Sequence, residues 1–209
     1  MSGFVHVVDD DASFRNAIER RLKQAGYAVA TYPSAMHLLV NLPAESIPSC
    51  ILLDVQIPGL DGPGLQKRLN ELGSTLPIVF ITGNPDIPTT VRAIKAGADD
   101  FLTKPVASEN LFRAIEQALA HHRTLRDLKD KLASVRARAG RLTPREREVF
   151  ELVVRGEPNK QIARAMGCTA RTVKAHHHNV MEKMQVKSLA ELVSIAERIG
   201  VASATRQMD

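Results

Sequence analysis

The first 105 residues alternate short apolar runs with segments in which apolar residues recur at helical spacing. The runs predict five strands, and the segments between them predict four amphipathic helices. Strand–helix alternation requires crossover connections, so the strands should form a parallel sheet with helices on both faces. The predicted strands are Phe4–Val8, Ala28–Tyr32, Cys50–Leu53, Ile78–Ile81 and Phe101–Thr103, and the predicted helices are Ser13–Ala25, Ala35–Leu42, Gly64–Leu72 and Thr89–Ala96.

Two of these strands, Cys50–Leu53 and Ile78–Ile81, are apolar at every position. Strands of this kind are typical of the centre of a parallel sheet, where both faces are buried. We therefore predict an α/β domain with a five-stranded, doubly wound sheet. Ligands of such sheets bind beyond the carboxyl ends of the strands.

A segment without Gly or Pro follows, from about Ser108 to Ala139. Ser108 can cap its start and Gly140 can end it, which predicts one helix of about 30 residues. Its apolar residues recur every seven positions, so this linker helix can pair with another copy. The alternative is a helix that frays after His122 into a tether. The seam positions are Leu111, Ala118, Leu125, Leu132 and Ala139, with Ala114, His121, Leu128 and Val135.

The last part of the chain predicts only helices, four in number. Thr143-Pro144-Arg145-Glu146 is a capping box with Pro at the first helical position. The two middle helices are joined by Gly167-Cys168-Thr169, which is the spacing of a helix-turn-helix. The other candidate caps are Asn159, Thr169 and Ser188.

Charge separates the two ends of the chain. Residues 1–120 carry a net charge of −3, residues 121–139 carry +4, and residues 140–209 carry +4. A basic second half suggests a polyanionic partner. No apolar stretch approaches the roughly 20 residues of a membrane span, and the N-terminus has no signal-peptide pattern, so we expect no membrane association and a cytoplasmic location.

Polar residues gather at the carboxyl ends of the predicted strands. Asp9–Asp11 follow the first strand, Asp54 ends the third, Thr82 ends the fourth and Lys104 follows the fifth. Clustered carboxylates indicate a hard divalent cation, of which Mg²⁺ fits best. Lys104 and Thr82 could bond phosphoryl oxygens, which leaves Asp54 as a nucleophile toward phosphorus. Each feature alone has an ordinary explanation, such as a helix cap or a turn, but all of them meet on one edge.

The segments VVDDD, LLDVQIPGLDG, ITG and KAGADDFLTKP resemble the signature blocks of two-component response-regulator receivers, over about residues 3–120. The resemblance implies strand order 2-1-3-4-5 and phosphorylation of Asp54. One departure is Pro85, which together with Pro88 should stiffen the loop that has to move. The implied roles are Mg²⁺ ligation by Asp9, Asp10, Asp54 and the backbone carbonyl of Gln56, phosphate pairing by Lys104, and switching by Thr82 and Phe101.

Residues 141–201 resemble the LuxR/NarL-type DNA-binding domain, and the whole chain resembles FixJ-type regulators. The helix after Thr169 is then the recognition helix. Its implied base contacts are Lys174, Ala175 and His178, and its implied backbone contacts are Thr172, His176 and Lys183. Its opposite face, with Val173, Val180 and Met184, should pack on Ile162, Ala163 and Met166. The run His176-His177-His178 is a poor metal site, because neighbouring helical residues point about 100° apart.

Together these features predict a transcription regulator that is phosphorylated on Asp54 by a sensor histidine kinase and is not an enzyme. We expect double-stranded promoter DNA as partner, a homodimer after phosphorylation, and RNA polymerase as a further candidate partner. The predicted domains are a receiver (1–120), a helical linker (121–139) and a helix-turn-helix domain (140–209). The alternatives are a phosphohydrolase with an aspartyl-phosphate intermediate and a protein-binding adaptor that works without phosphorylation.

Overall fold

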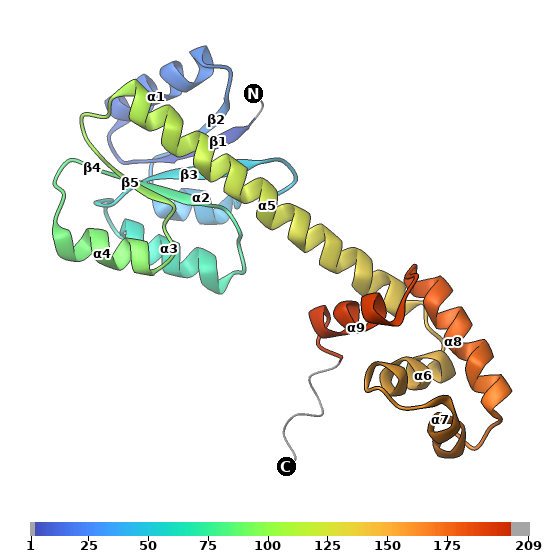
Figure 1. The fold of residues 1–209 in the computed structure, drawn as a ribbon. Helices are drawn as coiled ribbons and strands as arrows, with labels where there is room; N and C mark the ends of the chain where they lie inside the picture. Colours follow the sequence, from blue (N-terminus) through green and yellow to red (C-terminus); the bar gives the residue numbers. More distant parts are fainter. Residues whose placement is uncertain (1–2, 202–209) are drawn as a thin grey trace. The chain divides into compact units, whose positions relative to one another are not determined.

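A computed structural model describes residues 3–201, and the chain divides into two units between Arg126 and Asp127 (Figure 1). Every predicted strand is found with its ends within one residue, and the four helices between them lie within two residues of the prediction. The elements are β1 Phe4–Val8, α1 Ala12–Gln24, β2 Ala28–Tyr32, α2 Ala35–Val40, β3 Ser49–Asp54, α3 Gly62–Glu71, β4 Ile78–Thr82, α4 Ile87–Lys95, β5 Asp100–Thr103, α5 Ser108–Gly140, α6 Pro144–Val154, α7 Asn159–Ala165, α8 Ala170–Met184 and α9 Leu189–Arg198.

The sheet of the first unit is fully parallel and has the order β2-β1-β3-β4-β5, which confirms the predicted order. Its register decides what meets at the carboxyl edge. Val8, the last residue of β1, lies opposite Leu53, so the next residues of the two strands are Asp9 and Asp54. Thr82 pairs with Thr103 at the same edge, one residue before Lys104. The register therefore brings the candidate residues together.

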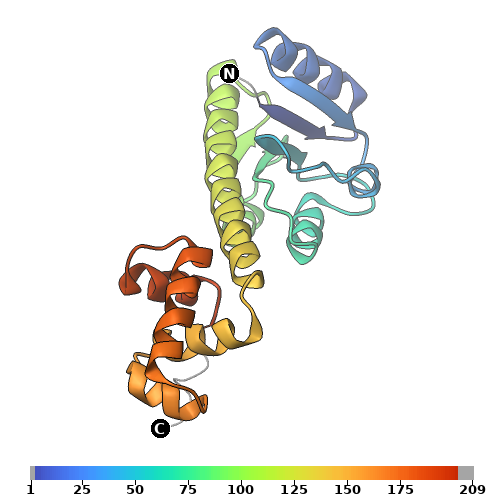
Figure 2. The same ribbon diagram turned by 90° about the vertical axis from the view of Figure 1, so that its right-hand side faces the viewer.

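Alternate residues of the central strands face two separate cores. In β3, Cys50 and Leu52 belong to the core under α1 and α5, while Ile51 and Leu53 belong to the core under α2, α3 and α4. Figures 1 and 2 show these two helical layers on opposite faces of the sheet. The apolar runs of the sequence therefore mark strands that are buried on both sides.

Two local features shape the edge where the carboxylates lie. The Asp11 side chain accepts hydrogen bonds from the backbone N–H groups of Ser13 and Phe14, so it caps α1. Gly62 packs so closely on β3 that an added Cβ would lie 2.7 Å from the backbone oxygen of Asp54. Of the three consecutive aspartates, Asp11 therefore begins a helix, and Asp9 and Asp10 remain as candidate site residues.

The linker helix α5 runs without a break for 33 residues, which confirms the predicted single helix and excludes the alternative of fraying after His122. Ser108 is the first helical residue and not the cap. The first backbone hydrogen bond of the helix runs from the N–H of Leu111 to the carbonyl of Ala107, so Ala107 occupies the cap position. The seam is divided: Leu111, Ala114 and Ala118 are buried in the first unit, and Val135 is buried in the second. Between these two buried stretches, Leu125, Leu128 and Leu132 keep exposed surface that could pair with another copy.

The second unit packs α6, α7, α8 and α9 together with the last turns of α5 around one apolar core. The predicted capping box is present, since Thr143 and Glu146 bond each other's backbone N–H groups. Asn159 is not a cap. The extended Pro158 precedes α7 and offers no side-chain bond, so α7 begins without one.

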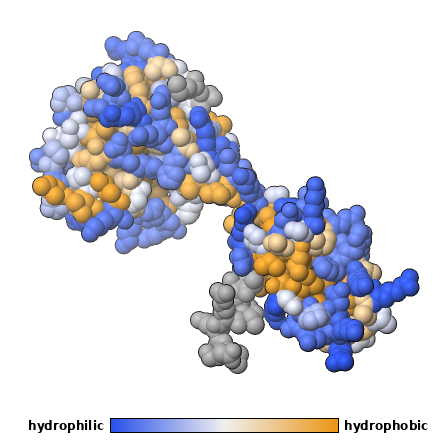
Figure 3. Space-filling view, in the orientation of Figure 1, coloured by the Kyte–Doolittle hydropathy of each residue, from blue (hydrophilic) through white to orange (hydrophobic). Residues whose placement is uncertain are grey.

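The face of the first unit that Figure 3 shows is largely hydrophilic, with an apolar patch over α4. The exposed apolar residues of this helix are Ile87, Val91 and Ile94, which share one face at helical spacing. Both cysteines are free; Cys50 is buried and Cys168 is partly buried. Among the helices of residues 3–201, none has the combination of length and apolar character that a membrane span needs.

Candidate functional site

Three carboxylates meet at the carboxyl edge of the sheet. Asp9 and Asp10 follow β1, Asp54 ends β3, and one oxygen of each lies within 4.8 Å of the others. Asp9 and Asp54 are only 2% and 7% exposed, whereas Asp10 reaches solvent. An all-oxygen donor set of this kind fits a hard divalent cation such as Mg²⁺.

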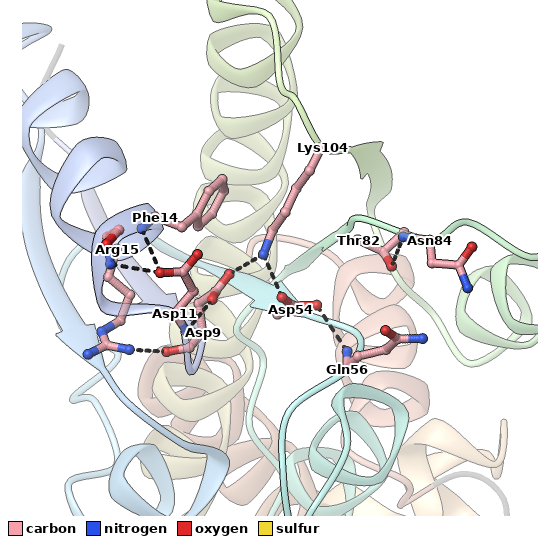
Figure 4. Close-up of polar contacts among 10 residues, drawn as sticks. Asp9, Asp11, Phe14, Arg15, Asp54, Gln56, Thr82, Asn84 and Lys104 are labelled. Atoms are coloured by element: carbon pink, nitrogen blue, oxygen red, sulfur yellow. Dashed lines mark hydrogen bonds and ion pairs between the residues drawn. The ribbon is translucent and has the colours of Figure 1, made fainter.

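Lys104 lies among these carboxylates (Figure 4). Its Nζ donates to Oδ2 of Asp9 and to Oδ2 of Asp54, each at 2.6 Å. Its own backbone is fixed by a 2.7 Å hydrogen bond from its N–H to the carbonyl of Thr82. Burial alone would lower the pKa of Lys104, but the bonds to Asp54 and Asp9 outweigh it and raise the pKa. The ammonium therefore remains charged beside the candidate nucleophile.

The two buried carboxylates are held by different groups. Oδ1 of Asp9 accepts the backbone N–H of Asp11, and its carbonyl accepts a 2.6 Å bond from Arg15. Burial raises the pKa of Asp9, although Lys104 and the Asp11 N–H favour its charged form. Oδ1 of Asp54 accepts the backbone N–H of Gln56 at 2.9 Å. Hydrogen bonds thus orient both carboxylates. The ligand role of the Gln56 carbonyl stays a prediction.

Thr82 lies on the opposite side of Asp54 from Asp9, as the strand order requires (Figure 4). Its hydroxyl accepts the backbone N–H of Asn84 at 3.2 Å, and within residues 3–201 no hydrogen bond joins it to Asp54. Phe101 is partly buried and packs on the ring of Phe80, with centroids 6.2 Å apart. The switch roles of Thr82 and Phe101 stay predictions.

Sequence reasoning missed two residues in the first turn of α1. The ring of Phe14 lies under the Lys104 ammonium, with Nζ 4.1 Å from the ring centroid. The guanidinium of Arg15 donates a hydrogen bond to the backbone carbonyl of Asp9. One signal was available: a helix that begins directly after Asp11 places its first turn at the same edge of the sheet as the aspartates.

The predicted recognition helix α8 has one buried and one exposed face. Val173, Val180 and Met184 are buried against Ile162 and Ala163, with Met166 packed beside them, which confirms the predicted core. The candidate DNA contacts Thr172, Lys174, Ala175 and His178 are exposed, and His176 is partly exposed. His177 differs from its neighbours, because its Nε2 is buried without a hydrogen-bond partner among the described residues.

Lys183, the last candidate DNA contact, is engaged inside the second unit. Its Nζ lies 2.6 Å from Oε2 of Glu146, a carboxylate that is 3% exposed and also accepts the backbone N–H of Thr143. The Lys183 bond, followed by the Thr143 bond, lowers the pKa of Glu146 to about 2. This ion pair joins the start of α6 to the end of α8.

Comparison with known proteins agrees with both halves of this description. Residues 5–116 match the family described as response regulator receiver domain, and residues 140–196 match bacterial regulatory proteins of the luxR family. Nodulation protein W of Bradyrhizobium diazoefficiens is 39% identical over 199 residues, covering 95% of this chain and 87% of that protein. The transcriptional regulatory protein FixJ of the same organism is 40% identical, covering 95% and 97%. The solved response regulator StyR is 42% identical, covers 95% of this chain and 100% of its own, and superposes with a TM-score of 0.76.

Proposed function

The chain belongs to the response regulators in which a receiver domain is joined to a LuxR-type DNA-binding domain, and from this membership we propose that phosphorylation of Asp54 is its switch. It is a phosphorylation-dependent regulator of transcription, and its partners are a histidine kinase and DNA. The observation that carries the proposal is the Lys104 ammonium held against Asp54 inside a cluster of three carboxylates.

The transfer itself is a displacement at phosphorus. An oxygen of Asp54 attacks the phosphoryl group carried by a histidine of the kinase, a new O–P bond forms, and the P–N bond breaks with its electron pair returning to the imidazole. Lys104 stabilises the negative charge on the phosphoryl oxygens, because it is already charged and within bonding distance of Asp54.

Asp9, Asp10 and Asp54, with the carbonyl of Gln56, would hold Mg²⁺. When bound, the ion neutralises charge between the carboxylates and the incoming phosphoryl group. After transfer, the added charge and acceptor oxygens attract the Thr82 hydroxyl and Lys104. The space left by Thr82 can receive Phe101, which alters the surface around α4 and β5.

The exposed face of α8 fits the major groove of DNA. We assign the base contacts to Lys174, Ala175 and His178 and the phosphate contacts to Thr172 and His176. The ion pair with Glu146 favours a structural role for Lys183 over the backbone contact that its position predicts.

Phosphorylation would favour a homodimer, in which two α8 helices reach two half-sites. Two exposed apolar surfaces support pairing: the α4 patch of Ile87, Val91 and Ile94, and the middle of the α5 seam. RNA polymerase is a candidate partner of the DNA-bound dimer. We propose residues 1–120, 121–139 and 140–209 as receiver, linker and DNA-binding domain, in a cytoplasmic protein without an enzymatic role.

Incubation with Mg²⁺ and acetyl phosphate, followed by intact-mass measurement, tests the proposal. The expected result is a gain of one phosphate, which is lost in Asp54→Asn and kept in the matched control Asp130→Asn, an exposed residue of α5. Duplexes are then selected from a random-sequence pool by the phosphorylated and the untreated protein. An Asp54→Asn protein that still gained phosphate, or selection that ignored phosphorylation, would contradict the assigned switch.

A further inference from the structure

We propose that Phe14 is a positioning residue for phosphoryl transfer, which holds the Lys104 ammonium at Asp54 through the face of its aromatic ring. The inference rests on the proposed role of Asp54 and deepens it by adding a residue that touches neither the phosphoryl group nor Asp54. The observation behind it is the contact of Lys104 Nζ with the ring, 4.1 Å from its centroid (Figure 4).

The ring has a fixed place in the fold. Phe14 stands in the first turn of α1, where its backbone N–H donates to the Asp11 cap at 3.2 Å. Its side chain packs against the core beneath α1 and α5, the core that contains Ile18. The backbone of Phe14 is therefore held by the helix cap and its ring by the core, while Lys104 reaches the ring on a flexible chain. The fixed partner orients the flexible one.

The chemistry of the contact is electrostatic as well as apolar. An ammonium has three N–H groups, and two of those of Lys104 are used by Asp9 and Asp54. The ring face is negative because of its quadrupole, so it attracts the same cation from a third side. An aliphatic side chain of similar size would fill the space without this attraction.

Without the ring, the ammonium keeps two carboxylate partners of similar strength and gains freedom to leave Asp54 for Asp9 or for solvent. The lysine side chain is 21% exposed, so water is available to replace the lost contact. We expect the reaction that needs the cation at Asp54 to slow about fivefold, the effect of one partly buried cation–π contact.

The first test measures the contact itself and needs neither Mg²⁺ nor phosphate. The protein is labelled with ¹³C at the lysine ε-carbons, and the Lys104 signal is identified by its loss in Lys104→Met. A lysine over a ring face has upfield-shifted ε-protons, so we expect this shift in the native protein and in Phe14→Trp. We expect its loss in Phe14→Leu. Absence of the shift in the native protein would overturn the proposal.

The second test separates the quadrupole from packing. With acetyl phosphate and Mg²⁺, Phe14→Tyr and Phe14→Trp should take up phosphate within about twofold of the native rate, and Phe14→Leu about fivefold more slowly. Stepwise fluorination of the Phe14 ring weakens the quadrupole with little change of shape, so the rate should fall with each fluorine. The matched control is Phe112→Leu, which alters the same core away from Lys104.

The outcomes distinguish the inference from the proposed function. If the native protein took up no phosphate on Asp54, the proposed function would be contradicted. The shift of the Lys104 ε-protons would still show whether the contact with the Phe14 ring exists. If native and Phe14→Leu proteins reacted equally, or fluorination had no effect, Phe14 would be packing only and the switch at Asp54 would stand. A loss of rate in Phe112→Leu equal to that in Phe14→Leu would also overturn the positioning role.

Discussion

The two units each contain a lysine held against a buried carboxylate at the same distance. Lys104 lies 2.6 Å from oxygens of Asp9 and Asp54, and Lys183 lies 2.6 Å from an oxygen of Glu146. The surroundings differ. The first lysine faces a cluster of three carboxylates, with Asp10 as the third, whereas the second faces one carboxylate that also accepts a backbone N–H.

This difference distinguishes a candidate binding site from an ion pair that only stabilises the fold. One ammonium cannot neutralise three carboxylates, so the first cluster keeps negative charge that favours a further cation. The Glu146 pair is balanced, and its carboxylate completes a capping box, so it needs no ligand. Charge excess, and not the presence of a buried ion pair, therefore distinguishes the candidate functional site.

The largest expected effect is on chemistry at the first lysine. Lys104→Met keeps an unbranched side chain, one atom shorter, and removes its charge, so phosphate uptake from acetyl phosphate should slow about 100-fold, as when one preorganised donor is removed. Glu146→Gln should take up phosphate at the native rate, because its ion pair belongs to the second unit. Equal slowing of both variants, measured by intact mass over time, would remove the distinction between the two lysines.

The next effect is on stability at the second lysine. The pKa of Glu146 falls from its ordinary value of about 4.5 to about 2, so the folded state favours the charged carboxylate. This stabilisation is complete above about pH 4.5 and is lost as the pH falls toward about 2, a change on the order of 3 kcal/mol. Glu146→Gln should lack that dependence and be less stable near pH 7.

Urea unfolding followed through the methyl signals of Val173 and Val180 reports the second unit alone, since both residues lie in its core. The native protein should lose stability through the acid range, and Glu146→Gln should not. Glu148→Gln is a matched control on the same helix, because Glu148 is exposed and pairs only at the surface with Arg145. Parallel curves for the native protein and Glu146→Gln would contradict the assignment.

Removing one of the excess carboxylates should raise the free energy of unfolding, by less than the loss expected at Glu146. Asp10→Asn removes one of three like charges, so the first unit should gain up to about 1 kcal/mol of stability when divalent ions are chelated. The same change should weaken Mg²⁺ binding, so added Mg²⁺ should reverse the difference. The measurement is urea unfolding with chelator and with Mg²⁺, and the exposed Glu116→Gln is the control. An Asp10→Asn protein that was less stable in chelator would argue against surplus charge.

The smallest expected effect concerns DNA. If Lys183 stays on Glu146 in the complex, Lys183→Gln should leave the salt dependence of binding to a nonspecific duplex unchanged. A lysine that contacts phosphate would instead reduce the slope of log K against log salt by about 1. Lys174→Gln is the comparison on the exposed face of the same helix. A reduced slope for Lys183→Gln would restore the backbone contact that the sequence predicted.

Much of the fold was predictable because local patterns agree with the global one. Strands buried on both faces leave continuous apolar runs, and the runs at Cys50–Leu53 and Ile78–Ile81 were placed within one residue. Capping chemistry is equally local, so Thr143, Thr169 and Ser188 were found where predicted. The prediction for Asn159 was wrong because the cap position of α7 is occupied by Pro158. Asn159 is already the first helical residue, so its side chain does not cap the helix.

The candidate pocket was also predictable, because parallel strands end at one edge and polar residues follow each of them. The partners of the pocket residues were not. Phe14 is an ordinary apolar residue of an amphipathic helix, and only the packing of α1 against the loop after β5 puts its ring beneath Lys104. The two ends of the α5 seam have a role that its seven-residue spacing does not reveal, because Leu111 and Val135 lie in two different cores. Pairing through the middle of the seam stays a prediction.

Local sequence patterns were enough to predict the helices and strands and the edge at which the aspartates gather, because hydrophobic periodicity and capping residues act over a few positions. The strand order followed from the family resemblance. Which carboxylates are in excess and which are paired became visible only in the folded chain, since it depends on side chains far apart in the sequence. Lys104 meets Asp9 across 95 positions, and Lys183 meets Glu146 across 37. Whether a carboxylate is neutralised depends on the distances between charges in the folded chain, and a local sequence pattern does not contain those distances.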